Sequence, residues 1–233
     1  MTSSILFRDR SDAGEQLARI VSIKVSEREN KKLNTPLVVY ALPRGGIPIA
    51  LPIAEHLGCP LDIIVAKKIA TPDNPELAIG AVTSNGSLMW TKPHLLRKIS
   101  WRGLKQAMEN ANQKAQEIKT QLSPYCSRIN PQGAIAIVVD DGIATGMTMK
   151  VAVQAIKDRQ AKEVWICAPV APLDLVPQLE LWGERVLLVA TPHPFLSVGR
   201  FYQKFAQVSL DEAISMLQKH NQSLKVNTNS LNY

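Results

Sequence analysis

Cysteine and histidine are scarce in this sequence. The 233 residues contain three cysteines and four histidines. Cys59, Cys126 and Cys167 are odd in number and too far apart for a Cys-x-x-Cys site, and no two histidines lie four residues apart. We therefore expect neither a disulfide framework nor a zinc ion held by protein ligands alone. Cys167 stands in an apolar run and is predicted to be a buried thiol.

Long hydrophobic runs are also missing. No stretch reaches the roughly 18 uncharged apolar residues that a membrane helix needs. The first residues, "MTSSILFRDRSDAGEQ", lack the apolar centre of a secretory signal. We therefore expect a cytoplasmic protein without a membrane partner.

Acidic residues are outnumbered by basic ones. There are 27 lysines and arginines against 20 aspartates and glutamates, which gives a net charge of +7. Such an excess suits either nucleic acid or a small polyanion such as a phosphorylated sugar. The basic residues are scattered, and neither a helix-turn-helix pattern nor a basic arm is visible. Nucleic acid is therefore not the expected partner.

The apolar pattern predicts an α/β fold. Apolar runs without polar alternation indicate buried strands at 37–42, 61–69, 134–139, 163–171 and 185–191. Helical patterns occur at 11–22, 46–58, 102–122, 147–160 and 172–183. Residues 76–91 suggest a hairpin around Asn85 and Gly86. This alternation predicts a parallel sheet covered on both faces. We expect one domain over 1–233, with a core over about 1–191 and an accessory lobe and frayed polar tail over about 192–233.

The stretch "AIAIVVDDGIATGMTMK", residues 134–150, carries the clearest chemistry. An apolar strand ends at Asp140 and Asp141, and small and hydroxyl residues lead into the next helix. Ligands of open parallel sheets bind beyond the carboxyl ends of strands, and helix N-termini attract phosphate. The loop is therefore predicted to bind a sugar phosphate, with the two acids accepting hydrogen bonds from ribose hydroxyls. The spacing fits neither a Walker A loop nor Gly-x-Gly-x-x-Gly.

The segment "VVDDGIATGMT" resembles the signature of type I phosphoribosyltransferases, which use 5-phosphoribosyl 1-diphosphate (PRPP). The stretches "FRDRSDAGEQLA", "ALPRGGIPIA", "NPELAIGAV" and "VGRFYQKF" are similar to a bacterial group of phosphoribosyltransferases with unassigned substrate. The resemblance implies a type I phosphoribosyltransferase-like core with a small hood lobe. It also implies transfer of the phosphoribosyl group to a nitrogen base or amine, with release of pyrophosphate. Mg²⁺ would be held mainly by substrate and water, near Asp140 and Asp141, and a homodimer is implied because dimers are common in the family.

The resemblance also assigns residues to roles. The catalytic set would be Asp140, Asp141, Lys67 and Lys68. The 5′-phosphate loop would consist of Gly142, Ala144, Thr145, Gly146, Met147 and Thr148. Pyrophosphate would lie against Pro43, Arg44, Gly45 and Gly46. The acceptor base would stack against Phe195, Val198, Phe201 and Tyr202. Residues 69–82 would begin a loop that closes over the site.

Other interpretations remain open from the sequence. Residues 42–46 also fit an ordinary strand–helix turn, the two lysines a solvated strand end, and the aromatic residues simple packing. A non-catalytic PRPP-sensing regulator that binds nucleic acid or a protein partner is the main alternative function. A hydrolase or phosphatase acting on a sugar phosphate is a third. Nothing in the sequence identifies the acceptor.

Overall fold

A five-stranded sheet forms the centre of the computed structural model, which describes residues 5–29, 35–71, 73–90, 96, 97 and 99–230. Its strand order is β2-β1-β6-β7-β8, and every neighbouring pair is parallel. The strands are β2 (Leu61–Ile63), β1 (Leu37–Ala41), β6 (Ile135–Val139), β7 (Glu163–Val170) and β8 (Arg185–Ala190). The predicted parallel sheet is confirmed.

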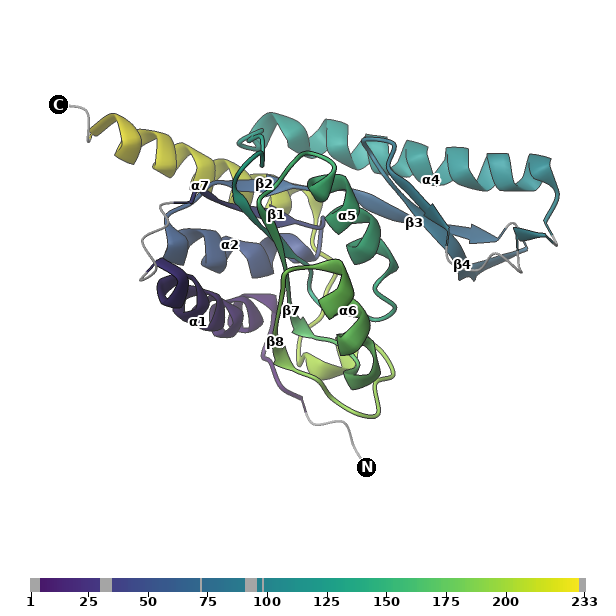
Figure 1. The fold of residues 1–233 in the computed structure, drawn as a ribbon, viewed down its shortest axis with the longest axis horizontal. Helices are drawn as coiled ribbons and strands as arrows, with labels where there is room; N and C mark the ends of the chain where they lie inside the picture. The colour runs from purple at the N-terminus through teal and green to yellow at the C-terminus, as the bar shows by residue number, and fades with distance from the viewer. Residues whose placement is uncertain (1–4, 30–34, 72, 91–95, 98, 231–233) are drawn as a thin grey trace.

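Helices cover both faces of this sheet (Figure 1). Alternate residues of one strand supply two separate cores, since Val39 packs in one and Val38 in the other. The first core contains α1 (Arg10–Glu29), α2 (Gly46–Leu57) and α7 (Leu210–Ser230). The second contains α5 (Met147–Lys157) and α6 (Val176–Trp182), the latter preceded by the 3-10 turn η2 (Leu173–Leu175). The predicted doubly covered α/β fold is therefore confirmed.

The predicted strand at 61–69 is wrong as a single element, because it is divided between two sheets. The amide of Ile64 donates to Ala41 O (3.0 Å), so the chain follows β1 to that point. Val65 O then accepts from the amide of Ser84 (2.9 Å), and the chain enters a second sheet. The short segment between the two strands lets the backbone change partners.

The second sheet is antiparallel and forms a separate lobe. Its strands are β3 (Ala66–Thr71), β4 (Asn74–Thr83) and β5 (Leu88–Trp90), and α4 (Trp101–Leu122) packs on it. We call residues 66–122 the arm, and Figure 1 shows α4, β3 and β4 projecting from the parallel sheet. The hairpin at Asn85 and Gly86 is confirmed, with Gly86 at φ +90°. Apart from Pro72, which lies outside the described residues, the predicted mobile loop at 69–82 consists of β3, β4 and the turn between them.

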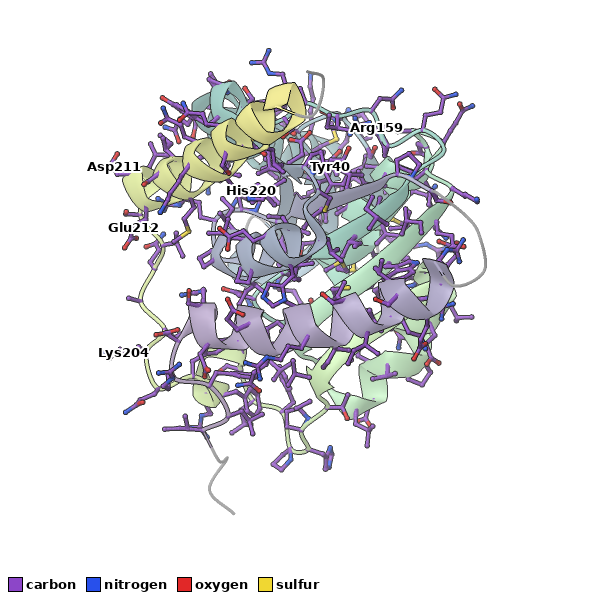
Figure 2. The ribbon with its side chains drawn as sticks, turned by 90° about the vertical axis from the view of Figure 1, so that its left-hand side faces the viewer. Tyr40, Arg159, Lys204, Asp211, Glu212 and His220 are labelled. Carbon is purple, nitrogen blue, oxygen red and sulfur yellow. The ribbon has the colours of Figure 1, made fainter. Side chains whose placement is uncertain are left out.

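The predicted frayed tail is wrong, because α7 continues through residue 230. The side chain of Asn221 bonds both the amide (3.3 Å) and the carbonyl (2.9 Å) of Leu61. Nε2 of His220 lies 3.0 Å from Cys59 O, and Figure 2 shows this side chain on the inner side of α7. Asn221, the first residue of the predicted tail, is thus hydrogen-bonded to the start of β2.

Residues 192–217 pack into the main core. Phe201, Val208 and Leu217 belong to the same apolar cluster as Val39 and Trp165. The small lobe is therefore the arm, in the middle of the chain, while the division of the chain near residue 191 stays a prediction. The three cysteines are free, and Cys167 is buried as predicted. No helix of the described residues is long and apolar enough to cross a membrane.

Candidate active site

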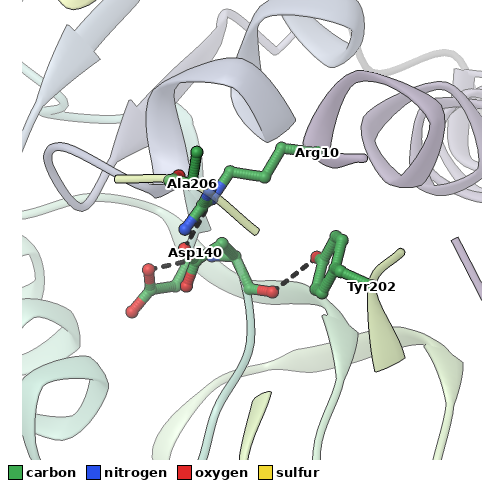
Figure 3. A network of polar contacts seen from close by, with 5 residues as sticks. Arg10, Asp140, Tyr202 and Ala206 are labelled. Atoms are coloured by element: carbon green, nitrogen blue, oxygen red, sulfur yellow. Dashed lines mark hydrogen bonds and ion pairs between the residues drawn. The ribbon is translucent and has the colours of Figure 1, made fainter. Parts of the chain in front are cut away.

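The two acidic residues of the central motif lie at the carboxyl end of β6. This strand runs between β1 and β7, and its residues are at most 2% exposed. The amide of Asp141 donates to Asp140 Oδ1 (2.8 Å), and the Tyr202 hydroxyl donates to Asp141 O (2.7 Å). Figure 3 shows these contacts. The backbone of the acid pair is therefore fixed from two sides.

Arg10, at the start of α1, binds the acid pair directly. Its Nε donates to Asp141 Oδ2 (2.8 Å) and its Nη1 donates to Ala206 O (2.6 Å). The guanidinium carbon lies 3.8 Å from the centre of the Phe205 ring. The side chains of Arg10 and Asp141 are only 11% and 17% exposed, so this ion pair is largely shielded from water.

The contact between Arg10 and Asp141 is not predictable from the sequence pattern. This arginine lies inside "FRDRSDAGEQLA", but 131 residues separate it from Asp141. No local spacing links two residues so far apart. The only available signal is the resemblance of that stretch to the bacterial group, which marks the segment without giving its function.

Burial raises the pKa values of both carboxyl groups. Burial, followed by the charge of Asp141, raises the pKa of Asp140 well above its usual range. Burial also raises the pKa of Asp141, while Arg10 opposes this shift. Asp140 Oδ2 and Asp141 Oδ1 accept no hydrogen bond from another residue in the described part of the chain. These two oxygens remain available to a ligand.

The loop from Gly142 to Thr148 presents backbone N–H groups. The Ile143 amide donates to Val170 O (2.8 Å), which ties the loop to β7. Gly146 is left-handed, at φ +72°, and no side chain caps α5 at this position. The first N–H groups of α5 therefore have no partner within the helix. Ala144 and Thr145 are exposed, Thr148 is half-buried, and the side chain of Met147 is buried, so Met147 can offer only its backbone.

The turn before α2 lies against the acid pair. A Cβ atom at Gly45 would collide with the Asp141 carboxylate, and one at Gly46 would lie 2.7 Å from Val139 O. Only glycine permits this approach. The peptide bond between Pro43 and Arg44 is cis. Residues 42–46 are thus packed on the end of β6, with Arg44 half-buried beside them.

The two lysines of β3 have different surroundings. Burial, followed by the charge of Arg44, lowers the pKa of Lys67, while Asp140 raises it. Lys67 is therefore close enough to both to interact electrostatically. Lys68 is exposed and lines a groove between β3 and α4. The structure brings Lys67 to the acid pair and places Lys68 elsewhere.

The four predicted base-binding residues divide into two pairs. Phe201 and Tyr202 are buried, at 2% and 5% exposure, with the Tyr202 ring centre 5.2 Å from that of Phe7. Phe195 and Val198 are half-buried, and Val198 lies against Gly142 of the loop. The second pair therefore has the surface that could meet a ligand. Base binding stays a prediction for all four residues.

The chain is similar to known proteins over most of its length. A family model described as "Phosphoribosyl transferase domain" matches residues 12–176. Two curated relatives, from two strains of Mycobacterium tuberculosis and each named "Putative phosphoribosyl transferase", are 37% identical over 221 residues. The match covers 92% of this chain and 47% of theirs, so the chain spans about half the length of these relatives. The crystal structure of TT1426 from Thermus thermophilus has a TM-score of 0.73 and 29% identity, covering 92% of this chain and 98% of its own.

Proposed function

The chain belongs to the phosphoribosyl transferase domain family, and on this premise we propose that it transfers the 5-phosphoribosyl group of PRPP to a nitrogen base or amine. Pyrophosphate is the second product. One observation carries the proposal. At the carboxyl end of the parallel sheet, three features follow one another along the chain: a buried strand, two carboxylates with free oxygens, and an uncapped helix N-terminus.

The 5′-phosphate and the ribose of PRPP would each find binding groups in this part of the chain. The free N–H groups between Ala144 and Thr148, with two threonine hydroxyls, would donate to the 5′-phosphate. Asp140 Oδ2 and Asp141 Oδ1 would accept from the ribose hydroxyls. The Arg10 ion pair would hold the Asp141 carboxylate in the orientation that this contact needs.

The diphosphate of PRPP would lie between the turn at 43–46 and β3. Arg44 and Lys67 supply positive charge there, and Gly45 and Gly46 let the turn lie directly against the acid pair and the end of β6. Because burial and Arg44 lower the pKa of Lys67, a bound anion would favour its protonated form. Lys68 lies in the neighbouring groove and is given no role at this site.

The acid pair also fits Mg²⁺ bound with the substrate. Carboxylate oxygens are hard ligands of the kind that Mg²⁺ prefers, and each acid has one oxygen free. Within the described residues, no group of three or more histidines, cysteines and acids could form a complete protein cage. Asp140 and Asp141 would therefore hold the ion through water and ribose oxygens. When bound, Mg²⁺ offsets the negative charge of the diphosphate and assists its departure.

The proposed reaction needs no covalent nucleophile from the protein. The bond from the anomeric carbon to the diphosphate oxygen breaks, and its electron pair leaves with pyrophosphate. The acceptor nitrogen forms the new bond to that carbon and loses a proton. Positioning and charge stabilisation are then the protein's contribution. The acceptor would bind beside Phe195 and Val198, and the homodimer implied by the resemblance stays a prediction.

A pyrophosphate-release assay tests this function. The protein is incubated with PRPP, Mg²⁺ and, one at a time, purines, pyrimidines and small amines. The expected result is pyrophosphate release that depends on one acceptor. Binding of PRPP without turnover on any acceptor would favour a PRPP sensor, and release that needs no acceptor would indicate a hydrolase.

Calorimetric titration with PRPP and Mg²⁺ tests the site itself. Thr148→Val removes a hydroxyl from the loop and is expected to weaken PRPP binding about tenfold. Thr35→Val is the matched control, because Thr35 bonds Lys162 (3.2 Å) ahead of β1, at the opposite end of the sheet. Equal affinities in the two variants would contradict the assignment of the phosphate loop.

A further inference from the structure

A groove separates β3 from α4 on the arm. Its cavity measures about 630 Å³, within the usual range for a small-molecule site. Lys68, Arg102 and Lys114 contribute positive charge to its lining, and no aspartate or glutamate is among the described residues that line it. The charged side chains of this lining are therefore all positive, and the proposed PRPP site does not account for them.

The positive and amide side chains of α4 form one stripe along the groove. Arg102, Gln106, Asn110 and Lys114 follow one another at intervals of four residues and all line the cavity. The helical rise of 1.5 Å per residue places the two cations about 18 Å apart along the axis. This separation suits an extended anion better than a single phosphate.

The N-terminus of α4 adds to the positive potential at one end. Ser100 caps this helix by accepting a hydrogen bond from the Gly103 amide (3.1 Å), and both residues line the groove. The positive end of the helix dipole therefore points toward the same end as Arg102. Helix dipole and side-chain charge act there in the same direction.

The three cations of the groove have no carboxylate partners among the described residues. By contrast, Lys105 on the same helix lies 3.8 Å from Glu109. The Nε2 of Gln106 donates to Asn110 Oδ1 (3.0 Å), which leaves the Asn110 amide nitrogen as a donor toward the groove. Unpaired positive charge and free donors are the groups that recognise an anion.

The charge of the whole arm supports the same conclusion. Residues 66–122 contain nine lysines and arginines against four aspartates and glutamates, a net charge of +5 out of +7 for the chain. Most of the excess charge therefore belongs to the arm and not to the sheet that carries the acid pair. Such a field would draw anions toward the groove.

We propose that this groove is a second anion site, which binds a linear polyphosphate such as inorganic polyphosphate or the phosphate chain of a nucleoside triphosphate. None of the described residues that line the groove is aromatic, which favours a free polyphosphate over a nucleic-acid strand, whose bases usually stack on aromatic rings. The site does not depend on the proposed transferase activity. Because the charge of Lys114 also lowers the pKa of Lys67, one end of the groove lies near the candidate active site.

Titration calorimetry with inorganic tripolyphosphate tests the proposal. The double variant Arg102→Gln/Lys114→Gln is expected to weaken binding about 100-fold, at roughly tenfold for each lost charge-assisted contact. The control Arg97→Gln/Lys105→Gln removes the same two residue types from the arm but leaves the groove lining intact. It is expected to retain binding within about threefold, since both side chains are exposed, neither lines the groove, and salt screens exposed charges.

Three outcomes would overturn the proposal. Equal weakening in both double variants would mean general attraction to the arm. Loss of binding in Arg44→Gln, with none in Arg102→Gln/Lys114→Gln, would place the tripolyphosphate at the candidate active site. Binding of oligothymidylate but not tripolyphosphate to the unmodified protein, lost in Arg102→Gln/Lys114→Gln, would assign the groove to nucleic acid. All four proteins should melt at similar temperatures, because the substituted side chains lie at the surface or in open cavities.

Discussion

The parallel sheet and the arm differ in how they are held together. Strand β6 is at most 2% exposed and packs against apolar helices on both faces. The apolar cluster of the arm has only four buried members among the described residues, namely Ile69, Ile79, Val82 and Ala111. The sheet thus has a large core to support the buried charges of the candidate site, whereas the arm has little apolar burial and most of the net charge.

This contrast indicates that the two regions support different kinds of charged group. Two neighbouring buried carboxylates are costly, and only a rigid surround can keep them in place. The arm carries unpaired cations that need no such support, since they are open to solvent. Regions with few buried contacts also open locally at lower free energy than the core.

The largest expected effect comes from removing a buried side chain in each region. Trp165→Ala, in β7, should lower the free energy of unfolding by about 3–5 kcal/mol, because it leaves a large cavity in the main core. Ile79→Ala, in β4, removes an equally buried side chain from the arm. In Ile79→Ala, native-state hydrogen exchange should accelerate in β3, β4 and α4, while β6 stays protected. Equal acceleration of exchange in the arm and in the parallel sheet would contradict the view that the arm opens separately.

The next effect separates stability from function within the parallel sheet. Asp140→Asn should reduce turnover about 100-fold or more, because a carboxylate that would orient the ribose is lost. The same change should raise the free energy of unfolding at neutral pH by about 1 kcal/mol, because a repelled buried charge is removed. Asp73→Asn, in the exposed turn of the arm, should alter neither quantity.

The free energy of unfolding should also depend on pH differently in the unmodified protein and in Asp140→Asn. Burial raises the pKa of Asp140 above the usual 3.8, so the folded state holds this proton more tightly than the unfolded state. Stability from this group is present below pH 3.8 and decreases as the pH rises through the raised pKa. Urea unfolding of Asp140→Asn should lack that decrease. An identical pH profile in both proteins would contradict the perturbed pKa.

The smallest of the three effects concerns Arg10. Since its charge lowers the pKa of Asp141, Arg10→Gln should raise that pKa further and move the acidic limb of PRPP binding to higher pH. Affinity at neutral pH should fall about tenfold. Arg10→Lys keeps the charge and should retain most of the pH profile. Arg102→Gln, on the arm, should leave PRPP binding unchanged. Equal loss of PRPP affinity in Arg10→Gln and Arg102→Gln would show that the arm takes part in PRPP binding.

The sequence predicts local features of this molecule well. The strand ending at Asp140, the loop to Thr148 and the hairpin at Gly86 each depend on a short run of residues, and the structure contains all three elements. Their hydrophobic period and turn chemistry are visible without tertiary contacts. The roles assigned to the site residues stay predictions.

Features that depend on distant contacts were not predictable in this way. The strand at 61–69 divides because Ile64 and Val65 bond different sheets. Asn221 stands in a polar stretch typical of a chain terminus, and only the structure shows its hydrogen bond with Leu61. The sequence also does not show which of Lys67 and Lys68 lies nearer the acid pair, because this depends on which face of β3 meets Arg44.

The contacts of Arg10 have a consequence for the order of assembly. A ribosome makes a chain from its N-terminal side, so Arg10 appears before Asp141, and Asp141 before Ala206. Until residue 206 has emerged, the guanidinium can have only one of its two oxygen partners. Nascent chains that end between residues 141 and 206 would therefore contain both acids but lack one of the oxygen atoms that hold Arg10 in place, so the contacts of the candidate site would be completed late in synthesis.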